Sequence, residues 1–256
     1  MIRRALTLLL LVVAVAACSS PKPQFKAQPD RASDINMELA IDYYRKGKLA
    51  EAKEKIDRAV DQNPRNAKAL ALAGLLYDRL GEGKKADGYF ERAMSVDNKD
   101  PEILNNYATY LCQKQRYERG EKLALQAASD PLYRTPDTAY VNAGNCARGR
   151  GDPKAAEDSY RKALALRPRS TEALYQMTDL EFRNKNYLQA RAFLERFVET
   201  RQTNAASLWL GWRIERALSN ATAMKTYSQR LKSEYPQSAE TKDLVEAEKS
   251  VEKNSG

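Results

Sequence analysis

The chain has 256 residues, of which 30% are charged, and its formal net charge is +9. It has three cysteines and no histidine, which excludes histidine-based acid–base catalysis, histidine-ligated metal sites and a four-cysteine zinc site. Ala, Leu, Glu, Lys and Arg dominate and strand-forming alternation is scarce, which favours a folded all-α protein. We therefore expect a non-enzymatic binding protein without a cofactor or a metal.

The first 17 residues have the pattern of a bacterial lipoprotein signal peptide. Arg3 and Arg4 precede an apolar run from Ala5 to Ala17, whose 13 residues are too few to span a bilayer. The run ends in Val15-Ala16-Ala17-Cys18, which resembles a lipobox, where the cysteine sulfur accepts diacylglycerol. We expect Cys18 to become the lipidated first residue of the mature chain. The alternative is an ordinary secretory signal in which this cysteine is incidental.

The segment after Cys18 indicates the membrane to which the chain is sorted and a tether that follows the anchor. Ser19 stands where an aspartate would signal retention at the inner membrane. By resemblance to the sorting rule of Gram-negative bacteria, this implies the outer membrane, with the protein on its periplasmic face. Residues 18–32 are rich in Pro, Lys, Gln and Ser and are predicted to form a flexible tether.

From residue 33 onward the sequence repeats itself at an interval of 34 residues. Gly47 and Gly81 are separated by this interval, as are Ile56 and Phe90. Such a period, with the spacing A-x3-F/Y/I-x2-A-x4-P, is the signature of tetratricopeptide repeats. Each unit is predicted to place a small residue of its first helix against a bulky residue of its second helix. A proline, such as Pro64, then ends the second helix.

This register predicts six units and a charged C-terminal cap or tail at residues 239–256. The units are 33–66, 67–100, 101–136, 137–170, 171–204 and 205–238. The third and fifth have Gln115 and Lys185 in place of the turn glycine, and the sixth fits only with a one-residue slip. Because helix-turn-helix repeats stack on their neighbours, the predicted fold is an all-α right-handed superhelix.

Cys112 and Cys146 lie on the first helices of the third and fourth units. In an oxidising compartment a disulfide between them is conceivable. However, a disulfide needs Cα atoms within roughly 7 Å, and neighbouring helices usually lie about 8–10 Å apart. We therefore expect two separate thiols rather than a bridge.

The concave side of the superhelix is the expected binding site for a partner, because the first helix of each unit lines it. The groove positions of the first four units give Met37, Ile41, Tyr44, Ala71, Leu75, Asn105, Thr109, Val141, Asn145 and Arg148. Apolar side chains in the first two units and amides in the middle units suit an extended or helical peptide. For the first unit the alternative stays open that its three residues pack beneath the tether or against the second helix.

Two stretches resemble a known family, the type IV pilus biogenesis lipoproteins or PilF/PilW-like pilotins. They are PEILNNYATYLCQKQRYERG at 101–120 and SLWLGWRIERALSNATAMKTYSQRLKSEYPQS at 207–238. Together with the lipobox, the tether and the six units, the similarity covers nearly the whole chain. The resemblance implies that the chain binds subunits of the outer-membrane secretin. It further implies that the chain promotes their localisation and multimerisation for type IV pilus biogenesis and twitching motility.

The same sequence features leave other functions possible. The runner-up is a periplasmic tetratricopeptide lipoprotein scaffold that regulates a cell-wall enzyme or an outer-membrane assembly machine. A nucleic-acid-binding helical repeat would account for the positive charge, but the export signal argues against it. Acids are interleaved with the bases along the chain, so we expect a solvated surface instead. We expect a monomer with protein partners, attached to the membrane by its N-terminal lipid.

Overall fold

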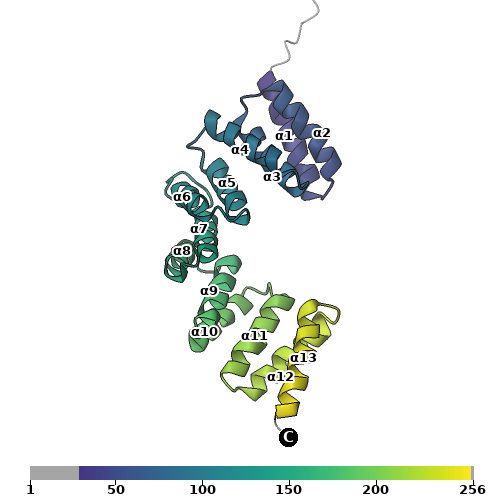
Figure 1. The fold of residues 1–256 in the computed structure, drawn as a ribbon, viewed down its shortest axis with the longest axis vertical. Coiled ribbons are helices and arrows are strands. Elements are labelled where there is room, and N and C mark those ends of the chain that lie inside the picture. The colour runs from purple at the N-terminus through teal and green to yellow at the C-terminus, as the bar shows by residue number, and fades with distance from the viewer. Residues whose placement is uncertain (1–28, 255–256) are drawn as a thin grey trace, which may run out of the picture.

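The computed structural model describes residues 29–254, which form thirteen helices joined by short connections (Figure 1). The predicted signal peptide, Cys18 and most of the predicted tether lie outside the described residues. The helices are α1 (Pro29–Arg45), α2 (Leu49–Gln62), α3 (Ala67–Arg79), α4 (Gly83–Val96), α5 (Pro101–Gln113), α6 (Tyr117–Ala128), α7 (Pro136–Arg150), α8 (Pro153–Leu166), α9 (Thr171–Arg183), α10 (Tyr187–Val198), α11 (Ala205–Ala217), α12 (Ala221–Glu234) and α13 (Ala239–Asn254).

Consecutive helices pack in pairs, and the pairs stack into a curved solenoid (Figure 1). The helices α6 and α8 lie on the outer side of the curve, whereas α5 and α7 lie towards the hollow. The first helix of a unit also contacts the first helix of the next, as α3 contacts α5 and α5 contacts α7. The predicted all-α tetratricopeptide solenoid is confirmed.

Local sequence signals fix where the helices begin. The helices α3, α5, α9 and α11 start at the residues where the repeat register placed the second, third, fifth and sixth units. α7 starts one residue earlier than its unit, and α1 starts at Pro29, inside the predicted tether. The Asp100 carboxylate caps α5 by accepting a hydrogen bond from the Glu102 amide at 2.8 Å, directly before Pro101. Polar capping residues and prolines therefore mark where the helices of the repeat begin.

The turn between the two helices of a unit requires a left-handed residue. Gly81 and Gly151 occupy this position with φ angles of 79° and 86°. Gln115 and Lys185 adopt the same conformation, with φ angles of 62° and 63°, although it costs an L-residue about 1–2 kcal/mol. Packing of the flanking helices therefore sets the turn, and the glycine only makes it less strained.

Close helix pairing within a unit depends on the small residue predicted for the first helix. A Cβ atom added to Gly74 of α3 would lie 2.7 Å from the buried Phe90 ring of α4. Gly144 and Tyr160 form the equivalent pair in α7 and α8. These aromatic rings are fully buried and belong to apolar clusters that continue along the solenoid. The predicted small-to-large pairing is thus confirmed.

A matched pair of glycine substitutions tests this packing. Gly74→Ala should destabilise the fold by about 1–3 kcal/mol, because the buried Phe90 ring must move to admit a methyl group. Gly88→Ala on α4 should instead stabilise it by about 0.5–1 kcal/mol, because that position is exposed and has open space around it. Urea unfolding of both variants measures the difference, and equal effects would contradict the close-packing role of Gly74.

The last helix, α13, packs on the sixth unit instead of extending the repeat. Leu244 is fully buried in a cluster with Leu208 and Leu231. The Glu248 carboxylate accepts a hydrogen bond from Ser228 at 2.7 Å and forms an ion pair with Lys232 at 2.6 Å. The charged C-terminal segment thus covers the apolar end of the solenoid, as a terminal cap must.

Candidate functional site

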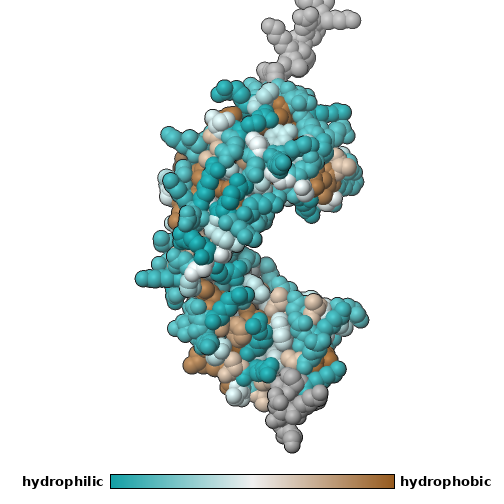
Figure 2. Space-filling model, viewed as in Figure 1, coloured by the Kyte–Doolittle hydropathy of each residue, from teal (hydrophilic) through white to brown (hydrophobic). Residues whose placement is uncertain are grey.

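The candidate site is the inner face of the solenoid, in the hollow between its two arms. Figure 2 shows this hollow, which in that view is lined largely by hydrophilic residues. Among the described side chains of residues 30–249, no three or more Cys, Asp or Glu residues are grouped so that they could hold a metal ion. None of the helices in this range is both long and apolar enough to cross a bilayer.

The first two units present an apolar but partly covered surface. Met37, Tyr44 and Leu75 are half-buried and pack against the core, while Ile41 is half-buried as well. The Arg79 guanidinium lies over the Tyr44 ring, 5.0 Å from its centroid. The alternative that the residues of the first unit pack against the core is therefore partly correct. One side of these side chains contacts the core, and the other side remains accessible to a partner.

Three of the predicted groove residues are too deeply buried to offer much surface. Ala71, Asn105 and Val141 are 2%, 7% and 3% exposed. The Asn105 amide oxygen accepts a hydrogen bond from the Asn142 amide at 2.9 Å, so it joins the third unit to the fourth. Thr109 donates to the Asn105 carbonyl of its own helix at 3.0 Å. These residues therefore contribute mainly to packing between and within the first helices, and present little surface to the hollow.

The polar groove residues of the fourth unit are accessible, but they already have hydrogen-bond or ion-pair partners within the chain. Asn145 accepts a hydrogen bond from the Tyr160 hydroxyl at 2.8 Å. Arg148 forms an ion pair with Asp179 of the fifth unit at 2.7 Å. Val141 and Asn145 line a polar hollow of about 400 Å³ between α7 and α9, together with Arg169. A partner could exchange these internal contacts for contacts with its own backbone.

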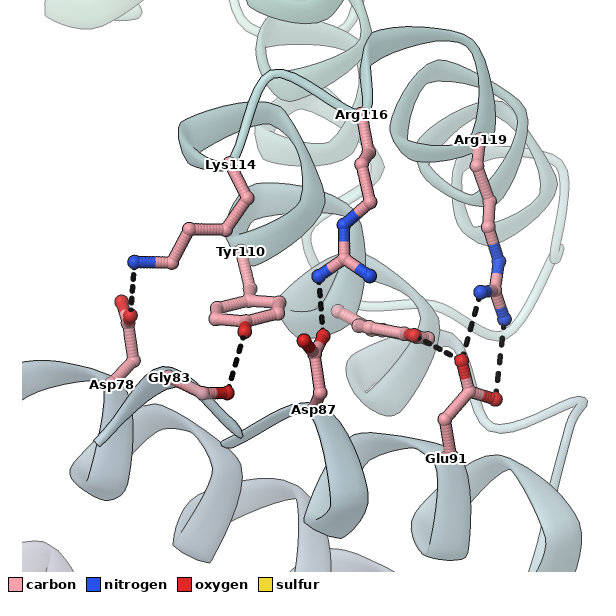
Figure 3. A network of polar contacts seen from close by, with 9 residues as sticks. Asp78, Gly83, Asp87, Glu91, Tyr110, Lys114, Arg116 and Arg119 are labelled. Carbon is pink, nitrogen blue, oxygen red and sulfur yellow. Dashed lines mark hydrogen bonds and ion pairs between the residues drawn. The ribbon is translucent and has the colours of Figure 1, made fainter. Parts of the chain in front are cut away.

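A polar network that the sequence did not predict joins the second unit to the third (Figure 3). Lys114 is paired with Asp78 at 2.7 Å, and the Tyr110 hydroxyl donates to the Gly83 carbonyl at 3.1 Å. Further along the same interface, two arginines of α6 and its N-cap meet carboxylates of α4. These pairs are Arg116 with Asp87 and Arg119 with Glu91. The network fixes how the two units sit on each other.

Protonation of Glu91 should loosen this interface. The Arg119 guanidinium and the Tyr107 hydroxyl, which donates at 2.5 Å, hold the pKa of Glu91 below its usual value. A lowered carboxyl pKa stabilises the fold above the unfolded-state pKa, and this stability is lost as the pH falls through the folded-state pKa. Glu91→Gln should therefore cost at most about 1 kcal/mol near neutral pH, since half of the Glu91 side chain is exposed and water screens the pair.

Thermal unfolding of the Glu91→Gln variant and the parent chain measures this effect across the pH range. The gap between their midpoints should be largest at neutral pH and should close as the pH falls below about 4. A gap that stays constant at all pH values would show that the carboxylate charge has no part in it.

The expectation of two separate thiols at Cys112 and Cys146 is wrong, because the structure joins them in a disulfide. Their Cα atoms lie 5.3 Å apart. Helix axes about 8–10 Å apart still allow this, because each Cα lies about 2.3 Å off its axis and facing Cα atoms come closer than the axes. A Cβ at Gly120 of α6 would collide with the Cys112 sulfur, so this glycine makes room for the bridge.

Comparisons with known proteins agree with the repeat register. Models of the family described as tetratricopeptide repeat match residues 37–95 and 147–209. The type IV pilus assembly protein PilF of Pseudomonas aeruginosa is 28% identical over 250 residues, which cover 96% of this chain and 99% of PilF.

Solved structures give the same relatives. The crystal structure of PilW, a widely conserved type IV pilus biogenesis factor, superposes with a TM-score of 0.78 at 28% identity, covering 83% of this chain and 98% of PilW. The structure of P. aeruginosa PilF gives a TM-score of 0.75 at 27% identity, covering 86% of this chain and 99% of PilF. The chain therefore has the tetratricopeptide-repeat fold and resembles PilF and PilW along nearly its whole length.

Proposed function

We propose that this chain is an adaptor of type IV pilus biogenesis, a pilotin that binds secretin subunits and promotes their multimerisation at the outer membrane. The observation that carries the proposal is the end-to-end similarity to PilF and PilW, since shared repeats alone would match many unrelated proteins. The sequence similarity covers 96% of this chain, and therefore all six units rather than a single pair of helices.

The inner face supports a binding role of this kind. Its first two units offer half-buried apolar side chains, including Ile41 and Leu75, and its middle units offer amides such as Asn145. Extended or helical segments of a partner bind such surfaces with apolar anchors and backbone hydrogen bonds. The disulfide and the network between the second and third units hold the surface in a fixed shape, which lowers the entropic cost of binding.

Attachment to the membrane belongs to the same proposal. A lipidated Cys18 would anchor the solenoid to the inner leaflet of the outer membrane, with residues 18–28 as the connection to α1. The anchor and the binding surface would then be separate parts of one chain. Binding would need only the solenoid, whereas delivery of the secretin subunits would need the lipid.

Separating these two parts tests the proposal. A Cys18→Ala variant should capture secretin subunits from detergent extracts as well as the parent chain does. In cells it should leave those subunits outside the outer-membrane fraction, because the complex lacks its anchor. Failure of both proteins to capture secretin subunits would reject the function, whereas capture with normal outer-membrane delivery by Cys18→Ala would reject only the lipid's role.

A further inference from the structure

Besides the polar hollow between α7 and α9, another small hollow lies at the C-terminal end of the inner face. It is lined by aromatic and arginine side chains. It has a volume of about 400 Å³, and its walls come from α9, α11 and α13. The side chains that carry the following inference are Phe182, Trp209, Trp212, Arg213 and Arg216. Phe182, Trp209, Arg213 and Arg216 occupy the same register positions in the fifth and sixth units as the predicted groove residues do in the first four. The proposed function makes no use of them.

The aromatic rings hold the two guanidinium groups in place. Arg213 lies over the Phe182 ring with its guanidinium carbon 4.4 Å from the centroid. Arg216 lies over the Trp212 ring at 5.4 Å, and Trp212 stacks on Trp209 with centroids 5.1 Å apart. A guanidinium stacked on an aromatic ring keeps its N–H donors directed outward and loses less freedom when a ligand binds.

Neither arginine has an anionic partner among residues 30–249, whose side chains the structure describes. Arg213 and Arg216 are exposed, and neither forms an ion pair or a hydrogen bond with a described residue, including Asp243 across the hollow. Arginines nearby on the same face differ, because Arg148 and Arg183 both bind Asp179. Two unpaired cations one helical turn apart thus face the hollow side by side.

We propose that this hollow binds a peptide segment that carries two carboxylate side chains on either side of an apolar side chain. Arg213 and Arg216 would donate hydrogen bonds to the carboxylates, and the apolar side chain would cover Trp209 and Phe182. The two positive charges favour an acidic ligand. The aromatic rings favour a ligand that also has an apolar side chain, rather than a free anion. Buried Trp and exposed Arg are also the residue types that dominate the energetics of protein interfaces.

The two tryptophans of the chain make this binding directly observable, because both line the hollow. The probe is a synthetic peptide with Glu-Leu-Glu between glycine-serine flanks, and its control replaces both glutamates with glutamine. Titration into the full chain should change the tryptophan fluorescence saturably with the acidic peptide. The glutamine peptide should bind at least about tenfold more weakly, since each carboxylate–guanidinium contact is charge-assisted.

Charge-neutral variants assign the effect to the arginines. Arg213→Gln with Arg216→Gln should weaken binding of the acidic peptide by about tenfold or more, while the chain stays fully folded at the temperature of the titration. The matched control, Lys84→Gln with Lys122→Gln, removes the same charge from exposed positions of the outer helices α4 and α6 and should bind the peptide like the parent chain.

Several outcomes would overturn the proposal. They are the absence of a saturable fluorescence change, equal affinity for the two peptides, and unchanged affinity in the arginine variant. Arginine-dependent binding of phosphatidylglycerol vesicles without peptide binding would also overturn it and would make the hollow a membrane contact instead. The proposal does not rest on the secretin function, because neither the probe nor the variants involve a secretin or the surface around Ile41 and Leu75.

Discussion

Removal of the Cys112–Cys146 disulfide is expected to lower the free energy of unfolding by about 3–4 kcal/mol. The bridge closes a segment with a sequence separation of 34, and a loop of that size loses this much conformational entropy in the unfolded state. It also joins α5 directly to α7, so its loss should loosen the middle of the inner face. Urea unfolding of the parent chain with and without a reductant, and of Cys112→Ala with Cys146→Ala, measures the loss.

The double alanine variant serves as the control for the reductant itself. Its unfolding curve should not respond to reductant, whereas the parent chain should shift towards the curve of the variant. Mass mapping under non-reducing conditions checks that the parent chain starts with the bridge formed. Two free thiols in the mature protein, or a parent chain that is fully reduced without any loss of stability, would contradict this account of the cysteines.

Placing aspartate at both Ile41 and Leu75 is expected to weaken binding of the secretin subunit by about a hundredfold, or about 2.7 kcal/mol. Both side chains are half-buried on the inner face of the first two units, where the proposed partner would place its apolar anchors. A carboxylate there would have to lose its hydration without gaining a partner. Surface-captured chain titrated with purified secretin subunits gives the affinity.

Leu39→Asp provides a matched control on the same helix. Leu39 is 42% exposed on α1 and does not occupy a groove position, so its replacement places one carboxylate on the same helix but outside the proposed surface. This variant should bind like the parent chain, and circular dichroism should show the same helix content for all three proteins. Equal weakening by Leu39→Asp, or full binding by a folded Ile41→Asp and Leu75→Asp variant, would remove the inner face of the first units from the site.

The repeat architecture could be predicted from the sequence because its signals are local. The small residue of α3 at Gly74, the bulky Phe90 of α4 and a proline such as Pro64 recur at a fixed interval, and each has a direct steric consequence. Gln115 and Lys185 did not disturb the register, since the flanking helices impose the left-handed turn on them. A period of this kind specifies neighbours one unit apart, which is all that a solenoid needs.

The inner surface was harder to predict, because its exposure depends on how closely successive units pack. Asn105 and Val141 lie at groove positions, but α5 packs against α7 there and covers them. Register positions alone do not report that spacing. The same limitation explains the error over Cys112 and Cys146, whose Cα atoms face each other across the narrow gap between two inner helices.

Other features had signals in the sequence that the repeat analysis did not use. In the network between the second and third units, the paired residues Asp87 with Arg116 and Glu91 with Arg119 are 29 and 28 positions apart, which places both members of each pair on the second helices of successive units or their N-caps. Opposite charges that recur at a similar separation on neighbouring second helices therefore indicate contacts between units. Extending the groove positions to the sixth unit would likewise have identified Arg213 and Arg216.

Secretin multimers in the outer membrane provide the most direct test of the proposed pilotin function. They would be quantified from outer-membrane fractions of a strain that lacks the gene for this chain, and of the same strain complemented with the parent sequence. We expect the multimers to disappear in the deletion strain, with monomeric secretin persisting, and the parent sequence to restore them. Normal secretin multimers and normal pili in the deletion strain would contradict the proposed pilotin function.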